Sequence, residues 1–201
     1  KTPPPTKLID TLMILGLFQR LKVSKAEGFA HIHGLIEATK QAFVVRNTHV
    51  TDPAHMTIHA TTYLADGLLV RLAADISPHY AAPWPQSGMP GDTVWIGAAD
   101  DSGRVVSLIQ SLSGPFGSGV MLRDTGILWH NRGASFRLGE GHPNRLAPRR
   151  KPFHTLSPAL AMLKDGRVMA YGAMGGEGQP QTQAAVFTRY GLCGQSLQGA
   201  V

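Results

Sequence analysis

One stretch, from Gly91 to Ser111, constrains the fold of this chain most strongly. It holds two apolar, β-prone runs on either side of Asp100-Asp101-Ser102-Gly103, whose residues tolerate left-handed backbone or bond to their own backbone. The pattern predicts a β-hairpin. With the turn centred near Ser102, Thr93 and Ser111 lie opposite each other, because each is nine residues from that centre. Directly opposed residues have Cβ atoms about 4.5 to 5.5 Å apart, so two hydroxyls would face each other.

Thr93 has two interpretations. A threonine hydroxyl is a weak nucleophile until a base removes its proton, and one solution uses the α-amine of the same residue, which must then be a chain N-terminus. Thr93 is internal, so this interpretation requires a cut between Asp92 and Thr93. The alternative is that Thr93 only begins a β-strand after the Pro/Gly-rich loop 73–92.

Composition narrows the class of protein. The 201 residues suit one domain or part of a larger one, and the single cysteine, Cys193, excludes an internal disulfide framework and a Cys-rich metal site. The net charge is +6. The densest basic run, Arg145 with 149–151, lies among prolines without interleaved aromatics, which favours a solvated loop over a nucleic-acid groove.

No membrane span, metal site or cofactor is expected. The apolar run Leu12–Phe18 is far shorter than the roughly 20 residues that a spanning helix needs. His55 and His59 have helical spacing but lack the acidic ligand of a zinc-protease pattern. The first residue is Lys, which is consistent with a processed or truncated chain, and the sequence does not distinguish a periplasmic from a cytoplasmic protein.

Hydrophobic periodicity predicts the remaining elements. Helices are expected over Lys7–Arg20 and Lys25–Arg46, the second with Phe29, Ile32, Ile36 and Phe43 on one face. Asp52-Pro53 is expected to cap a short helical segment. Further predictions are a strand at Gly126–Asn131, a hairpin of 159–163 and 168–173 around Lys164–Arg167, and a helix at Thr182–Tyr190.

Two adjacent glycines, Gly175 and Gly176, lie between the last predicted strand and helix. Glycines there let backbone N–H groups approach a ligand, and a helix N-terminus favours negative charge, which suits an oxyanion or a phosphate. The loop lacks the Gly-Lys-Ser/Thr of a nucleotide P-loop. A tight strand-to-helix turn is the structural alternative.

The order of these motifs resembles the γ-glutamyltranspeptidases. The resemblance covers almost the whole chain, since the helix to Gly16 and the following segment look like the end of the large subunit of that family. It rests on Gly91-Asp92-Thr93, Asp100-x-x-Gly103, Phe116-Gly117-Ser118-Gly119, Arg149-x-x-Pro152, Ser157-Pro158, Asp165-Gly166, Gly175-Gly176, and His33-x-Leu35-Ile36-Glu37-Ala38.

The resemblance implies an α+β fold, the αββα sandwich of N-terminal-nucleophile hydrolases, present here as part of a chain. It implies that residues 1–92 form the end of a large-subunit-like region and residues 93–201 the start of a small-subunit-like region. Thr93 would be the nucleophile and the bearer of the base amine, freed by self-cleavage. Ser111 would take the place of a second threonine, and Gly175 and Gly176 would supply the oxyanion-hole amides.

The resemblance also implies substrate-binding positions. Ser113 replaces an Asn that holds the γ-glutamyl group, and Ser135 replaces an Asp that binds its α-amino group. Thr155 matches the second residue of a Ser-Ser pair, and His154 replaces the first. The segment around Asn131-Arg132-Gly133 looks like the branch that contains cephalosporin acylases.

Two classes of function follow. The first is γ-glutamyltransferase-like acyl transfer or amide hydrolysis by Thr93, on a small γ-glutamyl or related acyl-amide substrate and together with the remaining segments of both subunits; a cephalosporin or glutaryl acylase is a variant of it. The second is an unprocessed or non-catalytic member that binds a small acyl amino acid. A nucleic-acid binder is the weakest alternative and would require steeply salt-dependent binding.

Overall fold

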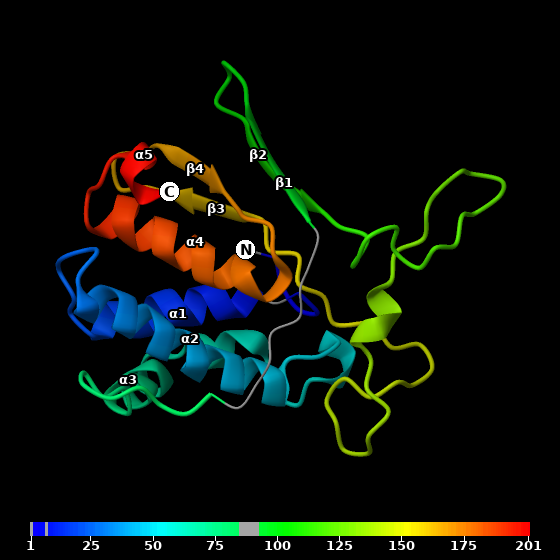
Figure 1. Ribbon diagram of the computed structural model, residues 1–201, viewed down its shortest axis with the longest axis horizontal. Coiled ribbons are helices and arrows are strands. Elements are labelled where there is room, and N and C mark those ends of the chain that lie inside the picture. Colours follow the sequence, from blue (N-terminus) through cyan, green and yellow to red (C-terminus); the bar gives the residue numbers. More distant parts are fainter. Residues whose placement is uncertain (1, 7, 85–92) are drawn as a thin grey trace.

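The computed structural model describes residues 2–6, 8–84 and 93–201, and it combines helices with two β-hairpins (Figure 1). Asp92 and the rest of 85–92 lie outside the described residues. The α-helices are α1 (Leu8–Arg20), α2 (Phe29–His49), α3 (Asp66–Ala74), α4 (Gln179–Phe187) and α5 (Leu197–Ala200). The strands are β1 (Val94–Ala99), β2 (Val105–Gln110), β3 (Ala159–Met162) and β4 (Val168–Tyr171).

Helix α1 is the centre of the hydrophobic core. It packs against α2, α3 and α4, and Figure 1 shows it between α2 and α4. Four of its apolar side chains, spaced along one helical stripe, are almost completely buried: Met13, Ile14, Leu17 and Phe18. The predicted helix is confirmed, and it ends before Lys22, whose φ of 55° is incompatible with a continuing right-handed helix.

Helix α2 buries a different face from the predicted one. Of the four large apolar residues expected together, only Phe43 is buried; Ile32 is exposed, as are Phe29 at 67% and Ile36 at 48%. The buried face carries mostly small and polar residues, which let α2 approach α1 closely. A Cβ on Gly34 would lie only 3.4 Å from the Phe18 ring. Close approach of the two helices, rather than the bulk of their side chains, therefore selects the buried face.

The β-hairpin predicted around Ser102 is present in the structure. Strands β1 and β2 are antiparallel, and Val94 pairs with Gln110 while Ala99 pairs with Val105, which centres the turn on Ser102. The Asp100 carboxylate accepts hydrogen bonds from the backbone N–H groups of Ser102 and Arg104, at 3.0 and 2.9 Å. This side chain organises the turn by mimicking backbone hydrogen bonding.

The second hairpin, β3 and β4, is also confirmed, with Ala159 opposite Tyr171. It adjoins the first hairpin through β2 and β4. The Tyr171 ring stacks on Phe187 of α4 at 5.8 Å between centroids, so this hairpin lies against the helix layer. Alternate side chains such as Leu108 and Leu160 are exposed on the other side of the strands.

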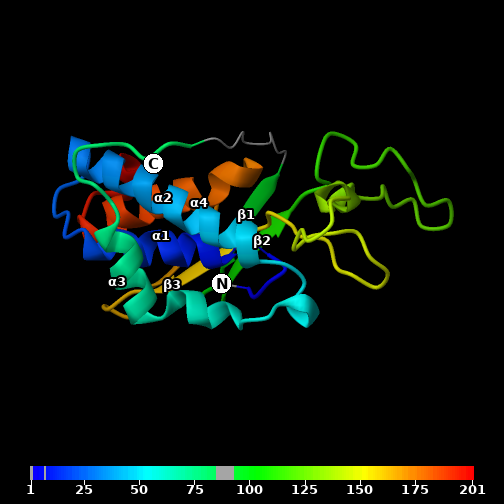
Figure 2. The same ribbon diagram turned by 90° about the horizontal axis from the view of Figure 1, so that it is seen from below.

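The segment between β2 and β3, residues 111–158, is an arm of turns that projects from the helices in both views (Figures 1 and 2). The predicted strand at 126–131 is wrong, because this part of the described arm contains only an isolated bridge between Met121 and Leu128. Gly126, with a φ of 67°, forms the tight turn between those two positions. A short 3₁₀-helix, η3 (Arg132–Ser135), follows.

The bounds of some helices also differ from the predicted ones. Helix α4 begins at Gln179, three residues before the predicted start, because Pro180 is well suited to the first helical turn, and it continues as a π-helical turn over Thr188–Leu192. The Asp52 cap is confirmed, and the segment that it begins is the 3₁₀-helix Pro53–His55. Among the described residues, no helix has the length and apolar character needed to cross a membrane.

Candidate active site

The hairpin register brings the two predicted hydroxyls together. Val94 pairs with Gln110, and the same register continued by one residue places Thr93 opposite Ser111. Both residues are partly buried. The geometric part of the prediction thus agrees with the observed pairing, while the chemical roles of both residues stay predictions.

A sharp turn follows Ser111. Its hydroxyl oxygen accepts a hydrogen bond from the Ser113 backbone N–H at 3.0 Å. Ser113 has a φ of 63° and Gly114 a φ of 121°, so the chain leaves β2 abruptly. The carbonyl oxygen of Leu112 then accepts the Asn131 N–H at 2.7 Å. This bond holds the start of η3 beside the residues that directly follow β2.

The Gly175-Gly176 turn leads into α4 with both glycines in left-handed conformation, at φ values of 101° and 52°. Side-chain-bearing residues rarely adopt such values, which explains two glycines in succession. Apart from Gly175 itself and its two chain neighbours, no described residue comes within 4 Å of the position that a Cβ on Gly175 would take. The side of Gly175 on which a side chain would lie is therefore unoccupied, and its role as an oxyanion-hole donor stays a prediction.

A buried ion-pair cluster supports this turn. Arg46 Nη1 of α2 lies 2.9 Å from Asp10 Oδ2 of α1 and 2.8 Å from Glu177 Oε2, the residue after Gly176. Arg46 is 3% exposed and Asp10 is completely buried. Charges that are buried this deeply are tolerated in proteins when they are paired. The cluster connects the glycine turn to the two central helices.

Trp95 connects the Thr93 strand to the glycine turn. Its indole nitrogen donates a hydrogen bond to the Ser107 hydroxyl at 2.9 Å, and that oxygen also accepts the Ala159 N–H at 3.2 Å. The Trp95 ring lies directly against Gly172, where a Cβ would overlap the ring. Trp95 is two residues after Thr93, and Gly172 is three residues before Gly175.

The remaining predicted positions gather around a residue that was not predicted as functional, Arg132. Its Nη1 donates a hydrogen bond to the Thr155 hydroxyl at 3.2 Å. Burial lowers the pKa of His154 to about 4, and the Arg132 and His130 charges act in the same direction. Ser135 ends the 3₁₀-helix that Arg132 begins. The Asn131-Arg132-Gly133 motif was a sequence signal for this position, but nothing in it indicated burial.

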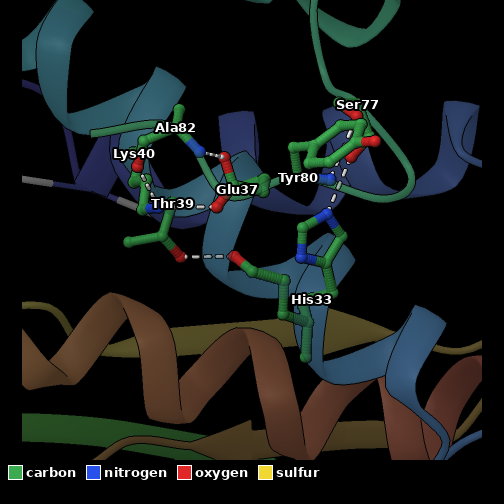
Figure 3. A network of polar contacts seen from close by, with 8 residues as sticks. His33, Glu37, Thr39, Lys40, Ser77, Tyr80 and Ala82 are labelled. Atoms are coloured by element: carbon green, nitrogen blue, oxygen red, sulfur yellow. Dashed lines mark hydrogen bonds and ion pairs between the residues drawn. The ribbon is translucent and has the colours of Figure 1, made fainter. Parts of the chain in front are cut away.

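The segment before residue 85 is held on α2 by a polar network (Figure 3). Glu37 accepts hydrogen bonds from Lys40 Nζ at 2.6 Å and from the Ala82 N–H at 3.0 Å. Lys40 Nζ also donates to the Ala82 carbonyl at 2.6 Å, and His33 Nε2 lies 2.7 Å from the Ser77 carbonyl oxygen. Ser77 and Ala82 are therefore anchored to the helix layer.

Metal-ligating side chains do not cluster in the part of the chain that the structure describes, where no three of them meet. His55 ends one 3₁₀-helix and His59 caps the next, so the two do not share a helical face. The His59 side chain instead accepts the backbone N–H of Thr61.

Comparisons with known proteins converge on one family. A sequence profile described as Gamma-glutamyltranspeptidase matches residues 1–201. The chain is 52% identical over 198 residues to the oxamate amidohydrolase proenzyme of Klebsiella pneumoniae, covering 98% of this chain and 38% of that protein. It is 39% identical over 197 residues to the glutathione hydrolase-like YwrD proenzyme of Bacillus subtilis, covering 96% and 37%.

A solved structure confirms the fold. Cephalosporin acylase from Bacillus halodurans superimposes with a TM-score of 0.84 at 32% identity, covering 94% of this chain and 34% of that one. The predicted fold class, that of N-terminal-nucleophile hydrolases, is thereby confirmed. The chain spans only about 38% of the length of the first of these relatives and 34% of the acylase.

Proposed function

The chain belongs to the γ-glutamyltranspeptidase family, and on that premise we propose that Thr93 is the nucleophile of an amide hydrolase, made active by a cut between Asp92 and Thr93. The observation that carries the proposal is the β1–β2 register, which sets Thr93 opposite Ser111 at the strand end. The proposed cut also defines two regions, 1–92 and 93–201.

The proposed reaction uses the freed α-amine of Thr93 as the base. The amine takes the proton of the hydroxyl, Oγ1 attacks the amide carbonyl, and the N–H groups of Gly175 and Gly176 bind the oxyanion. The C–N bond then breaks, and the proton passes to the leaving amine. Water, deprotonated by the same amine, attacks the acyl-enzyme ester, which releases the acid and restores the threonine hydroxyl.

Hydrolysis is the proposed outcome, ahead of transfer to an amine. The relatives are named oxamate amidohydrolase, glutathione hydrolase-like protein and cephalosporin acylase, and these names describe hydrolytic or acylase enzymes. We therefore expect a small acyl amide as substrate and water as acceptor. The remaining parts of both subunits would complete the site, since the chain spans 38% of the length of the first relative.

Processing and turnover of the complete protein that carries this chain test the proposal. Intact-mass measurement should find one fragment ending at Asp92 and one starting at Thr93. Thr93→Ala should abolish both the cut and amide hydrolysis, while Thr93→Ser should retain a measurable part of each, because a hydroxyl remains. An uncut wild-type protein that binds an acyl amino acid without hydrolysing it would instead establish the non-catalytic alternative.

A further inference from the structure

Arg46 joins two parts of the chain that the proposed cut would separate. Its Nη1 lies 2.9 Å from Asp10 Oδ2 and 2.8 Å from Glu177 Oε2. Arg46 precedes the proposed cut, whereas Glu177 follows it and comes directly after Gly176. The ion pair therefore reaches from the helices of the first region to the turn that carries the proposed oxyanion-hole amides.

Arg46 is a rigid anchor for this ion pair. Its guanidinium carbon lies 3.8 Å from the centroid of the Phe43 ring, its Nη1 donates a hydrogen bond to Asp10, and its Nε donates to Asn47 Oδ1 at 2.7 Å. Only 3% of Arg46 is exposed. Another rotamer of this side chain would leave the buried Asp10 carboxylate without its partner, and breaking a buried pair on one side is strongly unfavourable.

The glycine turn requires an anchor of this kind. Glycine has more backbone freedom than any other residue, so two glycines in succession leave the directions of their N–H groups weakly determined by the local chain. The Gly178 N–H donates to the Gly175 carbonyl oxygen at 2.8 Å, which closes the turn but does not join it to another element. The Glu177 carboxylate joins the turn to α2 through Arg46.

We propose that Glu177 and Arg46 are positioning residues for the oxyanion hole. Their ion pair aims the N–H groups of the two glycines, so that one product of the cut shapes the site on the other product. The inference rests on the proposed function of Thr93. An oxyanion-hole donor acts only when it points at the developing charge, and loss of one donor typically costs about 10²- to 10³-fold in rate.

Glu177→Gln tests the positioning role without removing a buried partner, because Arg46 keeps its pair with Asp10. The matched control is Glu27→Gln. It breaks another Glu–Arg pair across the proposed cut, and its partner Arg189 follows α4, at the end of that helix opposite to the glycine turn.

The complete protein is assayed with γ-glutamyl, succinyl and glutaryl p-nitroanilides, and the variants are compared on the one that the wild type hydrolyses fastest. Intact mass gives the fraction of cut protein, and kcat is expressed per cut molecule. In Glu177→Gln, kcat should fall at least about tenfold while KM changes less than about threefold, because the donors act in the transition state rather than in substrate binding. In Glu27→Gln, both constants should stay within about twofold of the wild type, because this pair does not reach the turn.

Nitrogen-15 relaxation of the two glycines in deuterated protein examines the turn without turnover, in cut and uncut protein alike. The order parameters of Gly175 and Gly176 should fall in Glu177→Gln and stay at the wild-type value in Glu27→Gln. Unchanged order parameters in Glu177→Gln would overturn the inference, and so would equal kcat in the two variants. Amide hydrolysis by Thr93→Ala would instead overturn the proposed function, and the order parameters would still decide whether Glu177 holds the turn.

Discussion

The indole ring of Trp95 lies directly against the backbone of Gly172, so the strand that begins beside Thr93 touches the strand that leads to Gly175. The indole N–H fixes the ring by donating to Ser107 on β2. One side chain therefore joins the strand that follows the proposed nucleophile to the segment that leads to the proposed oxyanion-hole amides.

Gly172→Ala should disturb this connection. The added methyl group would overlap the Trp95 ring, and an overpacked site typically loses about 1 to 3 kcal/mol of stability. Because the nucleophile and the oxyanion-hole amides must be held at a fixed distance and orientation, kcat should fall at least about tenfold. Gly139→Ala is the matched control, since no described residue other than its chain neighbours comes within 4 Å of its new Cβ. Equal kcat in both variants would contradict a positioning role for Trp95.

Arg46→Met should destabilise the fold strongly. It removes the partner of Asp10, whose carboxylate is completely buried, and breaking a buried pair on one side typically costs about 3 to 5 kcal/mol. Urea unfolding measures this free energy. Arg104→Met breaks an exposed pair with Asp100 and should cost much less, because solvent screens the two charges. A loss at Arg46 no larger than that at Arg104 would contradict the account.

Glu37 should contribute a pH-dependent part of the stability. Burial alone would raise its pKa, but the hydrogen bonds from Lys40 and Ala82 outweigh burial and lower the pKa below the usual 4.5. The contribution is then fully present above pH 4.5 and is lost as the pH falls through the lower pKa of the folded state. The difference in unfolding free energy between wild type and Glu37→Gln should therefore shrink on acidification. A difference that is independent of pH would exclude this linkage.

His154 should remain neutral at a pH where an ordinary histidine is charged. Its pKa of about 4, against 6.5 when unperturbed, means that the unfolded chain binds this proton first. Stability should thus decline as the pH falls from 6.5 towards 4, and His154→Gln should remove that part of the decline. Nitrogen-15 NMR of the imidazole checks the charge state directly; a midpoint near 6.5 would show that the ring is not buried beside Arg132.

The sequence predicted the local structure of the hairpin well because local chemistry determines it. Asp100 organises the turn through its own carboxylate, and a turn of known centre sets every pair along the strands up to Val94 and Gln110. The glycine turn was predictable for a similar reason, since Gly175 and Gly176 both require positive φ.

Features that depend on distant parts of the chain were not predictable in the same way. The buried face of α2 follows from its close contact with Phe18, and bulky residues such as Phe29 were assigned to the wrong face. Arg132 is buried by an arm without regular strands, and its partner Thr155 is 23 residues away. The periodicity of hydrophobic residues does not predict burial of this kind. The buried charge of Arg132 could therefore be identified only from the three-dimensional structure.

The most direct test of the central claim is to trap the acyl-enzyme. The complete protein is mixed with an amide substrate, quenched in acid within the first turnover, digested and analysed by mass spectrometry. We predict a peptide that begins at Thr93 and carries the mass of the acyl group on the threonine side chain. An acyl group on another residue, or an unmodified peptide in which Asp92 is still joined to Thr93 while the amide is hydrolysed, would contradict the account.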